Sequence, residues 1–362
     1  MEIYNQTRFV HAFTEALDKA GRSHLLLVVK GSFDFPDAEG QEPEVSREQR
    51  PLVMADEYTG EPGLSAMLWE SDFAFRKAHC DVILQGAAYA PGGRPVKSVR
   101  VGVKVGGWAK MLDVIGPREW RVVGPMVTAT EPRPFTKMHF SYDTAFGGRN
   151  RSDPGDPTPA VYQLNPVGLG WGGARKRLSG QSLPNTQGVG EPVTSPFGSY
   201  RPMALGPIGR GWPERLRYGG TYDQHWQDEI FPFLPEDFDD RYYQCAPEDQ
   251  QIEFPAPGTP VTLGNLTPRG REVFRLPRAT DLTIRVFRGR EMALERFVRP
   301  DTLLFDCEAR VMMMVYRVWV PMRRVITEFT ETWVGPPTRA MQRARETGKR
   351  YVRGVATEGV GA

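Results

Sequence analysis

The stretch VKSVRVGVKVG at residues 96–106 alternates valine with serine, arginine, glycine and lysine. A period of two residues is typical of a β-strand that buries one face and exposes the other. Further strand-like segments, separated by glycine and proline turns, lie on both sides of it at 24–35, 80–90, 108–116 and 118–124. We therefore predict an N-terminal β region over residues 1–140, built like an antiparallel β-sandwich.

Strand patterns return towards the C-terminus. They cover 260–266, 272–277, 281–289, 301–308, 310–321 and 326–334. We assign 271–335 to a C-terminal β region, and 336–362 to a basic tail that forms a short helix or stays mobile. The two β regions show no sequence repeat, so a shared sheet and two separate sandwiches both remain open.

Helical patterns are few, so the predicted fold class is mainly β with few short helices. The segment 71–78 is one helix candidate. The other is 13–21, where Thr14 is a suitable N-cap and Gly21 a suitable C-terminal stop.

The middle of the chain, residues 141–270, holds 19 glycines and 17 prolines together with many aromatic residues. This composition is too rich in turn formers for regular structure and too rich in aromatic residues for a disordered linker. We expect a long irregular segment that its aromatic side chains pin to the sheets, and long ordered loops are often functional. These aromatic residues can serve as inward anchors, as the lining of a protein-binding groove, or as both.

Overall charge argues against nucleic acid and membranes as partners, because 46 basic residues nearly balance 44 acidic ones. No apolar run suggests a signal peptide or a membrane span. Cys80, Cys245 and Cys307 match neither a disulfide framework nor a zinc motif. We therefore expect a reduced, cytoplasmic protein without a metal.

Six motifs of the middle segment follow one another in a distinctive order: AFGG (145–148), LNPVGLG (164–170), GPIGRGWPER (206–215), GTYDQHW (220–226), FPFLPEDFDDRYYQCAPEDQQ (231–251) and LGNLTPRG (263–270). In this order they resemble the domain-of-unknown-function family DUF2169. Members of that family are encoded beside type VI secretion genes and are regarded as adaptors or chaperones that load effectors. The likeness extends from the N-terminal YNQT to about Pro321.

The resemblance implies a non-enzymatic protein that binds an effector toxin or its PAAR-like tip carrier and brings it to a VgrG-type spike protein. Such binding is non-covalent and needs no cofactor. The residues of the matched motifs that it implies as partner contacts are Phe146, Arg149, Asn165, Pro166, Gly168, Trp212, Arg215, Tyr222, Asp223, Trp226, Pro235, Asp237, Phe238, Tyr242 and Gln250.

Two other functions stay open. A hydrolase would use Asp223, His225, Glu229 and Asp237 as acid and base groups in an aromatic-lined cleft. A structural component of the secretion apparatus would instead travel with the spike. The run 223–253, with ten carboxylates and one arginine, is either a solvated face or a contact for a basic partner.

Overall fold

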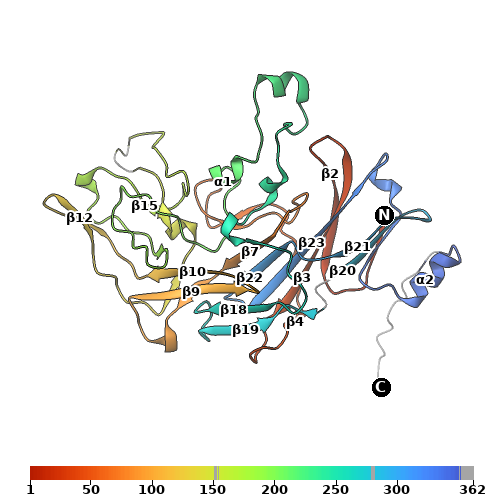
Figure 1. Cartoon of the computed structure of the whole chain (residues 1–362), viewed down its shortest axis with the longest axis horizontal. Helices are drawn as coiled ribbons and strands as arrows, with labels where there is room; N and C mark the ends of the chain where they lie inside the picture. The colour runs from red at the N-terminus through yellow and green to blue at the C-terminus, as the bar shows by residue number, and fades with distance from the viewer. Residues whose placement is uncertain (151–152, 154, 279–281, 350, 352–362) are drawn as a thin grey trace.

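Strands dominate the chain, as predicted. The computed structural model describes residues 1–150, 153, 155–278, 282–349 and 351. They form sheets of seven, five and four strands and several two-stranded ribbons (Figure 1). The predicted class, mainly β with few short helices, is confirmed.

The largest sheet joins the two β regions, so the shared-sheet alternative is the observed one. Its strand order is β17 (Gln251–Ile252), β7 (Cys80–Gln85), β22 (Thr302–Asp306), β23 (Val311–Pro321), β3 (Ser23–Asp34) and β2 (Val10–Leu17), with β4 (Glu44–Val45) paired to β3. Strands β7 and β22 run parallel, and the other neighbours run antiparallel.

Two further sheets complete the frame. The five-stranded sheet has the order β16 (Thr186–Gln187), β10 (Trp108–Ile115), β9 (Ser98–Val105), β18 (Pro260–Gly264) and β19 (Arg271–Arg275). The four-stranded sheet has the order β1 (Glu2–Asn5), β24 (Glu331–Val334), β20 (Leu282–Arg288) and β21 (Glu291–Val298). The ribbons pair β5 (Glu57–Tyr58) with β6 (Met67–Trp69), β8 (Ala87–Tyr89) with β13 (Lys137–His139), β11 (Trp120–Val123) with β12 (Met126–Ala129), and β14 (Phe146–Gly147) with β15 (Leu169–Gly170).

Helices are short. The α-helices are α1 (Pro213–Leu216) and α2 (Arg339–Glu346), and one π-helical turn covers Trp226–Ile230. Single 3₁₀ turns occupy Pro91–Gly93, Tyr142–Thr144, Arg175–Arg177, Asp240–Tyr243, Glu248–Gln250 and Ile326–Glu328. In α2 the Thr338 hydroxyl accepts a hydrogen bond from the Met341 amide and caps the helix. Within the predicted basic tail, 336–362, residues 350 and 352–362 lie outside the described part of the chain.

Both helix predictions in the N-terminal region are wrong. Residues 10–17 form strand β2, which pairs along its whole length with β3. Residues 71–78 form turns without a helix. The physical reason for β2 is pairing: a long neighbouring strand supplies inter-strand hydrogen bonds that outweigh the weak local preference for helix.

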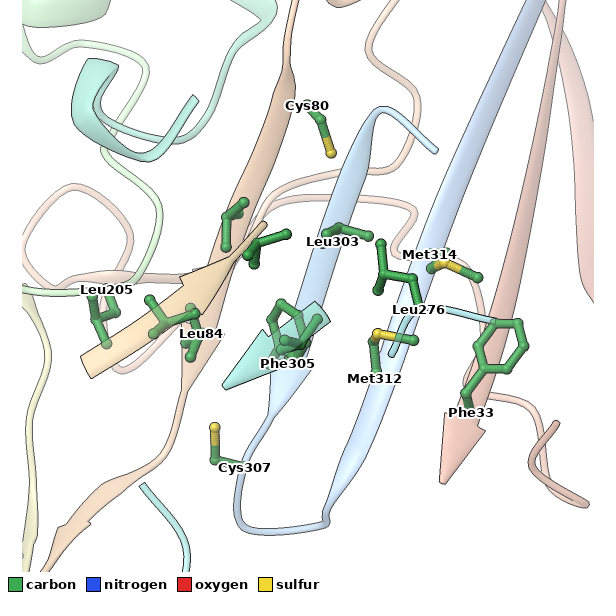
Figure 2. Packing of buried hydrophobic residues seen from close by; sticks show 14 of the residues in the cluster. Phe33, Cys80, Leu84, Leu205, Leu276, Leu303, Phe305, Cys307, Met312 and Met314 are labelled. Atoms are coloured by element: carbon green, nitrogen blue, oxygen red, sulfur yellow. The ribbon is translucent and has the colours of Figure 1, made fainter. Parts of the chain in front are cut away.

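Apolar clusters pack on both faces of the seven-stranded sheet. Residues of β3 alternate between them, with Leu25 and Leu27 on one face and Leu26 and Val28 on the other. The first cluster also takes in side chains of the five-stranded and four-stranded sheets, so the three sheets share one core. Figure 2 shows side chains from neighbouring strands meeting in this cluster, among them Leu84, Phe305, Met314 and Phe33.

Residues 244–246 of the middle segment pack against the second face of the sheet, where a buried charge fastens them. Asp81 of β7 accepts hydrogen bonds from the Cys245 amide at 2.9 Å and the Gln244 side chain at 2.7 Å, and it pairs with Lys77 at 2.6 Å. Burial disfavours the Lys77 ammonium, but the Asp81 carboxylate outweighs this and raises the pKa of Lys77. The irregular segment is therefore an integral layer of the fold.

Candidate functional site

One part of the middle segment leaves the body of the protein. Residues 221–234, which we call the aromatic arm, rise away from the sheets at the top of Figure 1. The two stems meet at the base, where a Cβ on Gly220 would lie only 2.7 Å from the Pro235 Cβ. Across the same base, the amide and hydroxyl of Thr221 donate to the Asp237 carboxylate at 2.9 and 2.8 Å.

Hydrogen bonds inside the arm fix its shape. The Asp223 carboxylate accepts from the Trp226 amide at 2.9 Å and starts the π-helical turn. The Trp226 indole N–H then donates to the Phe233 carbonyl at 2.9 Å, which closes the arm on itself. The Trp226 ring also meets the rings of Tyr222 and Phe231 edge to face, with centroids 4.7 and 5.5 Å apart. The arm therefore holds its shape largely through its own contacts.

The surface of the arm is aromatic and acidic. Tyr222, Phe231 and Phe233 are 55, 66 and 45% exposed. Asp223, Asp228 and Glu229 are also exposed, and residues 221–234 contain neither lysine nor arginine. Large exposed aromatic side chains on a constrained loop are a common feature of protein-binding surfaces.

The arm is oriented by contacts at one side and at its base. The Phe233 ring lies so close to Gly21, in the β2–β3 turn, that a Cβ there would be 2.5 Å from it. Beyond the base, Phe238 is buried and meets Tyr242 and Tyr243 edge to face. Pro235 and Phe238, both predicted partner contacts, therefore anchor the arm from inside, and Tyr242 is half-buried beside them.

Two ionisable groups of the arm and its base have shifted pKa values. Burial raises the pKa of Tyr222, and the nearby Tyr242 and Asp237 act in the same direction. Hydrogen bonds from Thr221 hold the pKa of Asp237 below its ordinary value. Asp237 is therefore a carboxylate at neutral pH, and its hydrogen bonds to Thr221 hold the two ends of the arm together.

Arg215 is buried in the body of the protein, and Trp212 is half-buried there. The Arg215 guanidinium pairs with Glu70 at 2.6 Å and donates to the carbonyls of Ile208 and Tyr242. Trp212 is half-buried and meets Tyr142 edge to face at 5.0 Å. Both side chains make their main contacts with other residues of the protein.

The AFGG and NPVG motifs form an interlocked turn. The buried Asn165 amide donates to the carbonyls of Tyr142 and Phe146 at 2.8 and 3.1 Å. A Cβ on Gly168 would lie 2.4 Å from the Asn165 Nδ2, so only glycine fits there. Phe146 is buried and Pro166 is half-buried, whereas Arg149 is exposed.

Gln250 is a buried link between layers. Its amide donates to the carbonyls of Val82 and Leu205, and its oxygen accepts from the Lys110 ammonium at 2.6 Å. Of the residues implied by the resemblance, those with exposed side chains are therefore Arg149, Tyr222, Asp223 and Asp237. Tyr222, Asp223 and Asp237 belong to the arm or its base, together with the half-buried Trp226.

The groups suggested for a hydrolase lie on the exposed arm and at its base. Asp223, His225 and Glu229 are exposed on the arm, and Asp237 is exposed at its base. In the described part of the chain, no group of three or more His, Cys, Asp or Glu residues could hold a metal ion. Phe231, Phe233 and Asp228 are arm residues that the motif argument passed over, because the sequence shows their aromatic or acidic nature but not their exposure.

One of three comparisons with known proteins gives a match. The model of a family described as "Uncharacterized protein conserved in bacteria (DUF2169)" matches residues 20–317. Neither the curated proteins nor the solved structures contain a match. Over the described residues, no helix is long and apolar enough to cross a membrane.

Proposed function

The chain belongs to the DUF2169 family, and from this premise we propose that it is a non-enzymatic cytoplasmic adaptor or chaperone for type VI secretion. It binds an effector, or the PAAR-like tip protein that carries it, through the aromatic arm. It then brings this cargo to a VgrG-type spike. The link to secretion rests on the resemblance of the motifs, and the arm supports the binding role.

The observation that carries the proposal is the exposure of three aromatic side chains on a loop that is already ordered. Tyr222, Phe231 and Phe233 offer apolar area without needing to fold first, because the hydrogen bonds of Trp226 hold the loop in shape. A flexible loop loses conformational entropy when it becomes ordered on binding, and this loss weakens the affinity. A loop that is already ordered in the free protein avoids this loss. A single aromatic hot spot can contribute about 2 kcal/mol or more to binding.

The charge of the arm indicates the kind of surface that it meets. Three exposed carboxylates, with no lysine or arginine between 221 and 234, favour a cargo segment that combines apolar with basic residues. Complementary charge of this kind mainly raises the association rate. Since salt screens exposed charges, the association rate should fall as ionic strength rises.

The test is a binding measurement with a matched control. Phe231→Ala removes the most exposed aromatic ring of the arm, whereas Phe197→Ala removes a ring of similar exposure, 61%, outside the arm. We expect Phe231→Ala to weaken binding of the purified effector by about tenfold or more. The thermal midpoint of either variant should shift by no more than about 4 °C. Equal affinities of the two variants would refute the role of the arm.

A further inference from the structure

Strand β2 leaves an open edge on the largest sheet. It is the last strand of that sheet, and within the described residues it pairs with β3 alone. Proteins usually protect a strand edge of this length with a proline, a bulge or several charges, because unpaired backbone groups attract another strand. The sequence of β2, VHAFTEAL, has no proline and a single carboxylate, and its register with β3 is uninterrupted.

The neighbouring strands show which backbone groups of β2 face this edge. The Ser23 carbonyl accepts a hydrogen bond from the Met322 amide at 2.9 Å, just after β23, so Ser23 turns its backbone away from β2. Leu17 lies opposite Ser23 and therefore turns its own amide and carbonyl away from β3. Because this direction alternates along an antiparallel strand, the amides and carbonyls of Phe13 and Glu15 also point to the open edge.

The side chains of these three residues form one row, because alternate residues of a strand share a face. Phe13 and Leu17 are 39 and 47% exposed, and Glu15 is exposed between them. The Glu15 carboxylate forms no ion pair with any described residue. Towards the start of the strand the row ends where the Asn5 side chain contacts His11 at 3.0 Å. We call Phe13, Glu15 and Leu17 the open row.

The open row suits a strand that carries a basic residue between two apolar ones at every second position. A second copy of the chain fits less well, because full antiparallel overlap of two open rows places Glu15 opposite Glu15 of the other copy, and like charges directly opposite each other destabilise a sheet. The turn after β2 rises on the same side of the molecule as the arm (Figure 1), and there Phe233 lies against Gly21. A partner held by the arm therefore lies close to the open row.

We propose that the open edge of β2 binds an extended segment of the cargo by strand addition. The backbone of the segment pairs with the outward amides and carbonyls of the open row. A lysine or arginine of the segment faces Glu15, and the apolar residues two positions before and after it pack on Phe13 and Leu17. This pattern reads the same in both directions, so it holds for parallel and for antiparallel addition. The identity of the partner rests on the function proposed above, whereas the site can be tested without it.

Fluorescence anisotropy with the full chain at low ionic strength tests the site. The probe is a labelled nine-residue peptide, capped at both ends, with lysine at its centre, isoleucine two residues before and after it, and threonine elsewhere. The reference peptide has glutamate in place of the central lysine. We expect the lysine peptide to bind at least about fivefold more tightly, because attraction to Glu15 replaces repulsion.

Charge reversal on the protein separates this site from a general effect of charge. Glu15→Lys should make the glutamate peptide the better ligand by about fivefold. Glu44→Lys is the matched control, since Glu44 is an exposed glutamate of β4 in the same sheet, and it should leave the preference unchanged.

Methylating the backbone nitrogens of the lysine peptide tests the strand ladder. The amides of a strand point alternately towards and away from its neighbour. Methyl groups on one set of alternate residues should therefore weaken binding by about tenfold, and methyl groups on the other set should leave it unchanged.

Several results would overturn the proposal. They are no binding of the lysine peptide up to about 1 mM, the same preference in the wild type and Glu15→Lys, and equal effects of the two methylation sets. Self-association of the free chain that Phe13→Lys abolishes would assign the edge to a second copy instead. If an effector binds the chain but the lysine peptide does not, this site is wrong and the adaptor function stands. If the lysine peptide binds but no effector does, the site stands and the adaptor function is refuted.

Discussion

Removing the Arg215 side chain should destabilise the whole protein, because this arginine ties three segments together in the interior. It is only 2% exposed, and it contacts the Glu70 carboxylate at 2.6 Å and the carbonyls of Ile208 and Tyr242 at 3.0 and 2.8 Å. Breaking a buried ion pair by removing one partner costs about 3–5 kcal/mol. Each carbonyl that loses its hydrogen bond adds about 1 kcal/mol to the cost of the substitution. Arg210, which also pairs with Glu70 at 3.0 Å, keeps that carboxylate partly paired and offsets part of the cost.

We therefore expect Arg215→Ala to lower the free energy of unfolding by about 3–5 kcal/mol. The assay is urea unfolding at pH 7, followed by tryptophan fluorescence. Arg217→Ala is the control, because Arg217 is half exposed and pairs with the exposed Glu248, a contact that contributes about 1 kcal/mol at most. If both variants unfold at the same urea concentration, the view of Arg215 as a structural tie is refuted.

Three further predictions concern the interlocked turn, the buried lysine and the hydrolase alternative. Gly168→Ala places a Cβ 2.4 Å from the Asn165 Nδ2, so the free energy of unfolding should drop by about 1–3 kcal/mol, and an unchanged urea midpoint would contradict this. Burial lowers the pKa of Lys110 from 10.5 to about 8, so the unfolded chain binds more protons between these values. The stability of the wild type relative to Lys110→Met should therefore rise by roughly 1 kcal/mol per pH unit from pH 8 towards pH 10, and a constant difference would refute the shifted pKa. The double variant Asp223→Asn, His225→Gln keeps the size of both side chains but removes their titrating groups. We expect its affinity for the partner protein to equal that of the wild type. A folded double variant that loses a chemical activity would favour the hydrolase.

Sequence pattern predicts the inner strands of the large sheets and the edge strand β19, but it misses the edge strands β2 and β21. Residues 96–106 alternate because one face of β9 packs into the core and buries every second side chain. Most side chains of β2 and β21 are half-buried or exposed, so these two strands carry no strict apolar alternation. The sequence of β21, EMALERFV, is rich in helix-forming residues, and its pairing with β20 overrides that preference.

The candidate site follows from sequence only in part. The richness of the middle segment in glycine predicts tight turns, and Gly147 and Gly148 lie in one, with φ angles of +147° and +99°. The sequence does not predict which aromatic side chains face solvent. Their exposure depends on which part of the folded protein each turn packs against. Phe238 and Phe231 belong to the same motif, yet one is 4% and the other 66% exposed.

The adaptor proposal depends on what the protein carries with it in its own cell. The tagged full chain and its Phe231→Ala variant would be purified in parallel from the native bacterium, and the bound proteins quantified by mass spectrometry. We expect an effector, a PAAR-like protein or a VgrG-type spike protein with the wild type, and at least about tenfold less of it with the variant. Recovery of none of these proteins with the wild type, or equal recovery with both chains, would contradict the proposal.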